Sequence, residues 1–72
     1  MVGIRFNDAD RAILSELLEG RATAAYIETQ IDWSRSYITQ RLKRLEEHGI
    51  VENLEETGLY ATRVEIDETE LA

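Results

Sequence analysis

The middle of the chain holds most of the side chains that could carry out chemistry. The stretch Trp33–Leu45 contains no Asp or Glu, although acids are frequent elsewhere. Its charged residues are all basic: Arg35, Arg41, Lys43 and Arg44. The same stretch contains five residues with hydroxyl or amide groups: Ser34, Ser36, Tyr37, Thr39 and Gln40. Basic, hydroxyl and amide side chains form hydrogen bonds with base edges and phosphates. The stretch therefore has the chemistry of a nucleic-acid contact.

The rest of the chain is strongly acidic. The 72 residues include 15 acidic and 8 basic ones, for a net charge of −7 and a pI near 4.5. Outside Trp33–Leu45, four bases stand against fifteen acids, which leaves −11 on the remainder. Seven of the eight bases are Arg. Such an acidic surface is typical of proteins adapted to strong brine, and the other explanation is a protein that binds basic partners.

Several classes of function are disfavoured by what the sequence lacks. There is no Cys and a single His48, so neither a thiolate metal site nor a multi-histidine site can form. With no nucleophile beside a base and no Gly-rich phosphate loop, we predict no enzymatic activity, no cofactor and no small-molecule ligand. No apolar stretch approaches the roughly 18 residues of a membrane span. We expect a cytoplasmic protein without membrane contact.

Capping residues and hydrophobic spacing predict three helices, over about 8–19, 24–30 and 34–48. Their expected N-caps are, in chain order, Asn7 or Asp8, then Thr23, then Ser34. Gly49 is expected to stop the third helix. The residues expected to face the core are Ile13, Leu14, Leu17 and Leu18 in the first helix, Ile27 and Ile31 in the second, and Ile38, Leu42 and Leu45 in the third.

The hydrophobic period changes from helix to strand after Gly49. Residues 50–54 and 59–66 are typical of two strands, and the loop 55–58 between them has Gly58 available for a positive φ. The residues of the second strand expected to face the helices are Tyr60, Thr62, Val64 and Ile66. We assign no role to the acidic segment 67–72. The prediction is one domain over 1–72, mainly α with a small two-stranded β-hairpin.

The order of these elements and two local motifs resemble a known family. Ser34-Arg35-Ser36-Tyr37-Ile38 is similar to the capped start of the recognition helix in winged helix-turn-helix transcription regulators. The segment 41–51 is similar to the end of that helix and the start of the wing. With its acidic surface, the chain resembles most closely the phi-H phage repressor-like proteins of halophilic archaea. The resemblance covers nearly all of the chain and implies a recognition helix at about 34–48 and a wing at about 50–66.

The helical period predicts which side of the third helix would read DNA. If its apolar stripe faces the core, Ser36, Gln40 and Lys43 lie on the opposite side, at about 100° per residue. Gln40 can form two hydrogen bonds with adenine, and Lys or Arg can reach guanine. Arg41 projects nearer the core, where a structural or phosphate role is expected. The residues expected to contact DNA are Ser34, Arg35, Ser36, Tyr37, Thr39, Gln40, Lys43 and Arg44, with Arg63 from the wing.

The residues and the resemblance together predict a sequence-specific DNA-binding regulator that acts as a repressor. Its third helix would enter the major groove of double-stranded DNA. It would bind as a homodimer, because one module of this size reads few bases. The alternative is a winged-helix module that binds another protein and no DNA. Acidic side chains folded over the third helix would favour that alternative.

Overall fold

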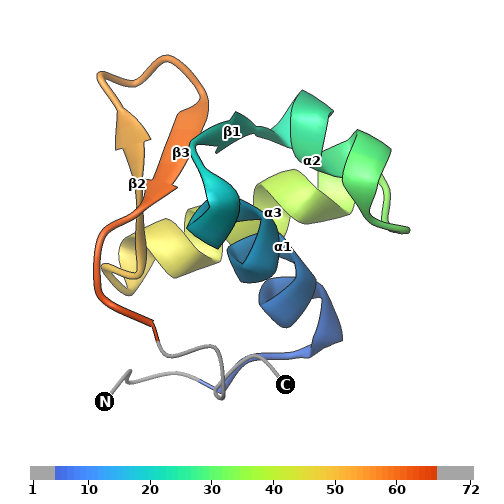
Figure 1. The fold of residues 1–72 in the computed structure, drawn as a ribbon, viewed down its shortest axis with the longest axis horizontal. Helices are drawn as coiled ribbons and strands as arrows, with labels where there is room; N and C mark the ends of the chain where they lie inside the picture. Colours follow the sequence, from blue (N-terminus) through green and yellow to red (C-terminus); the bar gives the residue numbers. More distant parts are fainter. Residues whose placement is uncertain (1–4, 67–72) are drawn as a thin grey trace.

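Six short elements follow one another along residues 5–66, the part of the chain that the computed structural model describes (Figure 1). They are α1 (Asp8–Glu19), β1 (Ala22–Thr23), α2 (Ala24–Gln30), α3 (Arg35–Glu47), β2 (Val51–Leu54) and β3 (Leu59–Thr62). The three predicted helices are confirmed, each within one residue of its predicted ends, and so is the mainly α fold with a small hairpin. The predicted acidic segment 67–72 lies outside the described residues.

Each helix begins at a side chain that accepts a hydrogen bond from the first helical turn. Asn7 Oδ1 accepts from the Asp10 N–H at 2.7 Å, and Thr23 and Ser34 act in the same way at α2 and α3. At α1 the bond is returned, because Asp10 Oδ2 accepts from the Asn7 N–H at 3.1 Å, which completes a capping box. Each cap stabilises its helix by about 1 kcal/mol. The predicted caps are confirmed, with Asn7 rather than Asp8 at α1.

The end of α3 is a Schellman turn that leads directly into the hairpin. The Ile50 N–H donates to the Leu45 carbonyl at 2.9 Å, and the Gly49 N–H donates to the Glu46 carbonyl at 3.0 Å. This pattern needs a residue in the left-handed region, and Gly49 has a φ of 73°. The turn places Ile50 in the core, where it is 3% exposed. The predicted stop at Gly49 is therefore confirmed.

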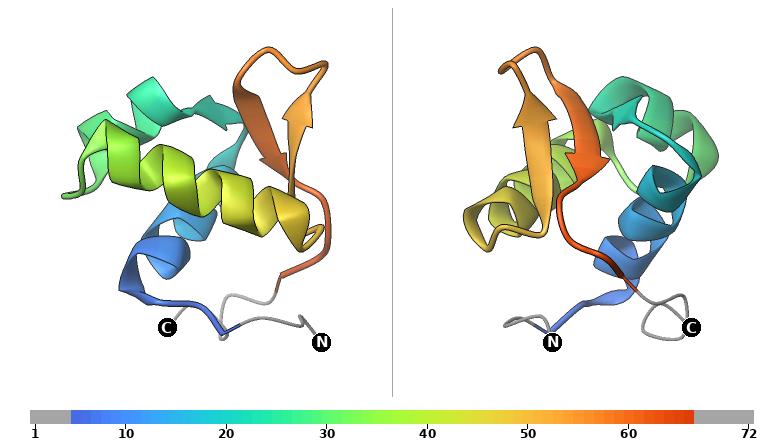
Figure 2. Two further views of the ribbon diagram at one scale, coloured as in Figure 1. Left: turned by 180° about the vertical axis from the view of Figure 1, so that it is seen from behind. Right: turned by 60° about the vertical axis from the view of Figure 1, so that its left-hand side comes forward.

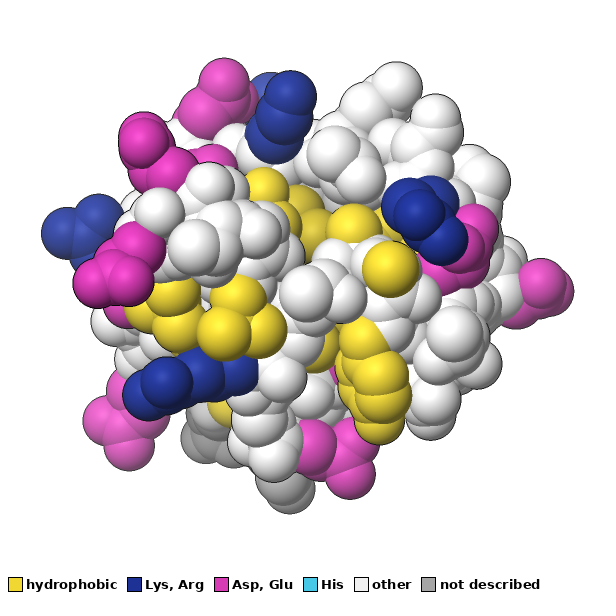
Figure 3. All heavy atoms as spheres, turned by 90° about the horizontal axis from the view of Figure 1, so that it is seen from above, with side chains coloured by type: hydrophobic (Ala, Val, Ile, Leu, Met, Phe, Trp, Pro, Cys, Tyr) yellow, Lys and Arg dark blue, Asp and Glu magenta, His cyan; other side chains and the backbone are white. Residues whose placement is uncertain are grey.

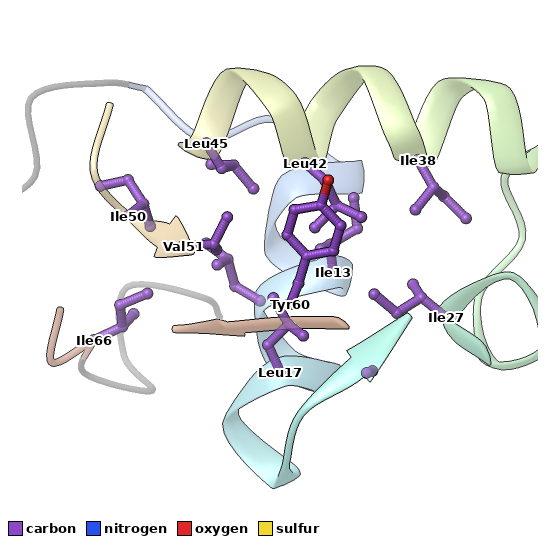
Figure 4. Close-up of a cluster of buried hydrophobic side chains, with 12 residues drawn as sticks. Ile13, Leu17, Ile27, Ile38, Leu42, Leu45, Ile50, Val51, Tyr60 and Ile66 are labelled. Atoms are coloured by element: carbon purple, nitrogen blue, oxygen red, sulfur yellow. The ribbon is translucent and has the colours of Figure 1, made fainter. Parts of the chain in front are cut away.

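One apolar core joins the helices to the hairpin (Figure 4). From α3 it receives three side chains that are all 0% exposed: Ile38, Leu42 and Leu45. The other members are Ile13, Leu14 and Leu17 of α1, Ala22, Ile27 of α2, and Ile50, Val51, Tyr60 and Ile66 from the hairpin region. Burying a side chain of this size contributes about 1.5–3 kcal/mol. Because the core takes one side of α3, the opposite side of that helix faces solvent.

The structure adds a third strand to the predicted two-stranded hairpin. β1 pairs antiparallel with β3, with Ala22 opposite Tyr60 and Thr23 opposite Leu59, and the sheet order is β1-β3-β2. β2 and β3 pair antiparallel from Val51 opposite Thr62 to the turn. Since Thr23 also caps α2, the short strand β1 ties the start of α2 to the hairpin.

Two predicted core positions are wrong. Leu18 is 37% exposed, because Ile13, Leu14 and Leu17 already fill the buried side of α1 and Leu18 lies at the outer edge of that stripe. Val64 is 39% exposed, because β3 ends at Thr62 instead of continuing to residue 66, so the alternation of faces stops there. Ile66 is nevertheless buried, at 6% exposure.

Candidate nucleic-acid interface

One side of α3 is open to solvent. Seen from behind, α3 lies in front of α1, and the hairpin stands at its C-terminal end (Figure 2, left). Ser36, Gln40 and Lys43 are all exposed, on the side opposite the buried stripe. Thr39 is half-buried at one edge of this surface, and Arg44 is exposed at the other. The predicted orientation of α3 is confirmed, and its polar side chains are accessible to a ligand.

An acidic residue of α2 holds the start of α3. Glu28 Oε2 accepts from the Arg35 backbone N–H at 3.0 Å, and Glu28 Oε1 lies 3.2 Å from Arg35 Nε and 3.1 Å from Nη2. Ser34, exposed, accepts from the Tyr37 N–H at 3.2 Å. The N–H of Arg35 and its side chain, which is one of the predicted DNA contacts and is 61% exposed, are thus both hydrogen-bonded to Glu28.

Tyr37 connects α3 to the start of α1. Its hydroxyl oxygen accepts a hydrogen bond from Asn7 Nδ2 at 3.1 Å, over a separation of thirty residues. The side chain of Tyr37 is half-buried, on the flank of α3 that turns toward α1. The same asparagine caps α1, so its two side-chain atoms link the first helix to the third.

Arg41 forms a buried ion pair with α1. Its Nε and Nη2 atoms donate to the two carboxylate oxygens of Asp10 at 2.7 and 2.6 Å. The Asp10 side chain is 0% exposed and that of Arg41 is 19% exposed. The hydrogen bond to Asp10 raises the pKa of Arg41 above its ordinary value, and burial partly offsets this by lowering it. Paired fork to fork with Asp10, Arg41 has a structural role, which is one of the two roles, structural or phosphate contact, expected from its position near the core.

The positive charge of Trp33–Leu45 is smaller than its composition indicates. Glu28 and Asp10 neutralise two of its four bases. Lys43 and Arg44 are exposed, and neither has an ion-pair partner among residues 5–66. The exposed residues Glu46 and Glu47 follow at the end of the helix. The positive charge of the exposed side therefore lies mainly at positions 43 and 44.

The tip of the hairpin is acidic and strained. Glu55 and Glu56 have φ values of 50° and 57°, and the Thr57 N–H donates to the Leu54 carbonyl at 3.0 Å, as in a type I′ turn. A non-glycine residue in this region costs roughly 1–2 kcal/mol. Gly58 has a positive φ of 85°, as predicted, but it follows the turn instead of forming it. The turn thus presents two exposed carboxylates.

The one basic side chain predicted to act from the hairpin lies away from this tip. Arg63 directly follows β3, and its N–H donates to the Ile50 carbonyl at 2.8 Å. It is exposed at the base of the hairpin, next to the end of α3.

On the face seen from above, the basic side chains stand apart from one another, and acidic ones lie beside several of them (Figure 3).

The order of elements is typical of a known class of domain. A helix, a turn and a second helix with an exposed polar side are followed by a hairpin. Residues 6–52 match the family described as winged helix-turn-helix DNA-binding, over more than half of the chain. The chain belongs to this family. By their order in the chain, α2 and α3 correspond to the helix-turn-helix of this family, in which the second helix is called the recognition helix, and β2 and β3 correspond to its wing. The comparisons with curated proteins and with solved structures give no match.

Two further properties concern the winged helix within residues 5–66. No group of three or more His, Asp or Glu side chains is placed to hold a metal ion there. None of the helices in that range has both the length and the apolar character that a membrane crossing requires.

Three residues of this interface were missed in the sequence: Asn7, Asp10 and Glu28. Asn7 was identified only as a candidate cap of α1, and the partners of Asn7 and Asp10 in α3 are about thirty residues away in the chain. No local pattern indicates such a distant contact. Glu28 is seven residues from Arg35 across a short turn, and this pairing of opposite charges was a usable signal.

Proposed function

We propose that this winged helix is a sequence-specific transcriptional regulator, a repressor, that inserts α3 in the major groove of DNA. The observation that supports the proposal is the two-sided character of α3. Its apolar stripe is fully buried, and its opposite side offers an amide, a hydroxyl and an amine to solvent. A helix of this shape fits the major groove, where base edges carry a distinct pattern of donors and acceptors.

The exposed side suggests a division of labour among the contacts. Gln40 would bind adenine N6 and N7, and Lys43 would bind guanine O6 and N7. Ser36 and Thr39 would meet base edges on either side of Gln40. We assign the phosphate contacts to Ser34, Arg35, Tyr37 and Arg44, with Arg63 from the base of the wing.

The wider setting of this activity is also part of the proposal. A homodimer would double the number of bases read, since one recognition helix contacts only a few. The resemblance to phi-H phage repressor-like proteins supports a repressor of a halophilic archaeon, acting on DNA in the cytoplasm. The excess of acids and the preference for Arg over Lys agree with that origin.

We expect Gln40→Ala and Ser36→Ala to reduce discrimination between operator and scrambled DNA by about 1–3 kcal/mol for each base that is no longer read. Nonspecific affinity should change little, because phosphate contacts supply it. The operator is found first by footprinting the upstream region of the gene. Binding to both DNAs is then measured at one salt concentration.

Ser15→Ala in α1 and Gln30→Ala in α2 are matched controls at exposed positions and should leave the preference unchanged. Equal losses of affinity on both DNAs would show that Gln40 and Ser36 do not read bases.

The neutralised bases favour one alternative, a winged-helix module that binds another protein. Glu28 forms an ion pair with Arg35, and exposed acids lie at the wing tip and at the end of α3. Against it, Lys43 in the middle of the exposed side has no ion-pair partner among residues 5–66. An absence of operator binding in the footprint would favour the protein-binding module.

Stability is expected to rise with salt. With fifteen acids and only eight bases, the acidic side chains repel one another in dilute buffer. Salt screens this repulsion, because the Debye length falls from about 10 Å at 0.1 M to about 3 Å at 1 M salt. The ion pair of Asp10 and Arg41 is buried and is screened less. Thermal melts in KCl, followed by circular dichroism, should therefore shift upward.

A double variant provides the control for this prediction. Glu55→Gln with Glu56→Gln removes two exposed negative charges at the wing tip. Its melting temperature should rise less steeply with KCl than that of the parent protein. A melting temperature that stays flat from dilute buffer to molar KCl would contradict the proposed adaptation to brine.

A further inference from the structure

Asn7 holds the hydroxyl group of Tyr37 in one hydrogen-bonding role. Asn7 Oδ1 accepts from the Asp10 N–H at 2.7 Å, which fixes the amide oxygen toward the first turn of α1. The amide nitrogen therefore points the other way, where it donates to Tyr37 Oη at 3.1 Å. Turning the amide over would set its nitrogen against the Asp10 N–H and break the cap. The cap of α1 thus dictates that Tyr37 meets a donor.

The phenolic proton of Tyr37 is consequently directed to another acceptor. A hydroxyl has one proton and two lone pairs, and the Asn7 nitrogen can only donate to it. No atom within residues 5–66 accepts a hydrogen bond from Tyr37 Oη. The hydroxyl therefore has its proton available for an oxygen atom of a ligand.

The surrounding charges favour an anionic acceptor. Arg44 lies two turns beyond Tyr37 on the same flank of α3, exposed and without an ion-pair partner in the described part of the chain. Both acids of the first turn of α1 are paired, Asp8 with Arg11 and Asp10 with Arg41. The flank therefore combines a neutral donor with a positive charge, which suits the phosphate backbone of DNA.

We propose that Asn7 is a positioning residue for DNA binding, which directs the Tyr37 hydroxyl to donate to a phosphate oxygen of the DNA backbone. The inference rests on the proposed function and extends it beyond the helix-turn-helix, because Asn7 precedes α1. The contact is independent of sequence, since phosphates are alike at every step. It would fix the position of the recognition helix along the groove while Gln40 reads the bases.

The test uses Tyr37→Phe, Asn7→Ser and the double variant in the full chain. The first change removes the hydroxyl, and the second keeps a capping oxygen but lacks the amide donor. Fluorescence anisotropy with operator and scrambled DNA should show each single variant binding both DNAs about three- to tenfold more weakly. The double variant should bind no more weakly than either single variant, because the two residues act through one contact.

Two further measurements separate a phosphate contact from a structural effect. In Tyr37→Phe and Asn7→Ser, the slope of affinity against salt concentration should equal that of the parent, because a neutral hydroxyl releases no counterion. Arg44→Ala should lower that slope by about one unit. Tyr26→Phe is the matched control, since Tyr26 is 54% exposed on α2, and it should bind as the parent does. Melting curves establish that every variant is folded at the assay temperature.

Each possible result decides the proposal. Normal DNA binding by Tyr37→Phe would overturn the inference about Asn7 and Tyr37. The proposed function would still stand in that case if Gln40→Ala lost its preference for the operator. Normal binding by Asn7→Ser, or affinity losses that add in the double variant, would show that Asn7 does not position Tyr37. No DNA binding by the parent protein at any salt concentration would overturn both the proposed function and this inference.

Discussion

Arg41→Met is expected to lower the free energy of unfolding by about 3–5 kcal/mol, because it leaves the Asp10 carboxylate buried without its partner. Asp10 is 0% exposed, and both of its oxygens accept from Arg41, at 2.7 and 2.6 Å. One bond would survive, from the Asn7 N–H at 3.1 Å, which is too little to solvate a full charge. Urea unfolding at neutral pH, followed by circular dichroism, measures the decrease.

A matched substitution on the same helix separates this effect from the removal of positive charge. Arg44→Met removes an exposed Arg from α3 and should change stability by no more than about 0.5 kcal/mol. Adding Asp10→Asn to Arg41→Met removes the buried charge and should restore part of the stability. If Arg41→Met were as stable as Arg44→Met, the ion pair would not hold α3 against α1, and its role would have to be sought on the DNA.

The elements that could be predicted from the sequence are those fixed by neighbouring residues. Thr23 and Ser34 cap helices through bonds to residues three positions away, and Gly49 ends α3 through bonds within one turn. The buried stripe of α3 follows from its own 3.6-residue period. Because the exposed side is the complement of that stripe, the accessible members of the candidate site were predictable as well.

The features that escaped prediction depend on contacts between distant segments. β1 has only two residues, too few to show a period, and it exists because β3 offers it an edge. The partners of Asn7 and Asp10 lie in α3, and nothing near them in the chain indicates it. Val64 was placed in the core by an alternation that β3 does not sustain beyond Thr62.

The net charge of the exposed side of α3 shows the same limit. Counting residues gave four bases in Trp33–Leu45, but the fold brings Glu28 and Asp10 to two of them. The charge available to DNA is therefore decided by packing between helices, which composition cannot show.

Leu42→Ala is expected to cost about 2–5 kcal/mol of unfolding free energy, a large part of the total for so small a domain. Leu42 is 0% exposed, and its side chain lies on the inner side of α3 among the other side chains of the core (Figure 4). Truncating it removes apolar burial and leaves a cavity that α1, α3 and the sheet can close only by moving. Urea unfolding of the purified variant measures this cost.

Leu18→Ala is the matched control, because it makes the same chemical change at a position that is 37% exposed. It should cost less than Leu42→Ala, since more than a third of Leu18 already meets water. DNA binding by Leu42→Ala should fall in proportion to the unfolded fraction, whereas the affinity of the folded molecules should equal that of the parent at the same salt concentration. If Leu42→Ala and Leu18→Ala were equally stable, the orientation of α3 would be wrong. The assignment of Ser36, Gln40 and Lys43 to the bases would then fail with it, because that assignment depends on Leu42 pointing inward.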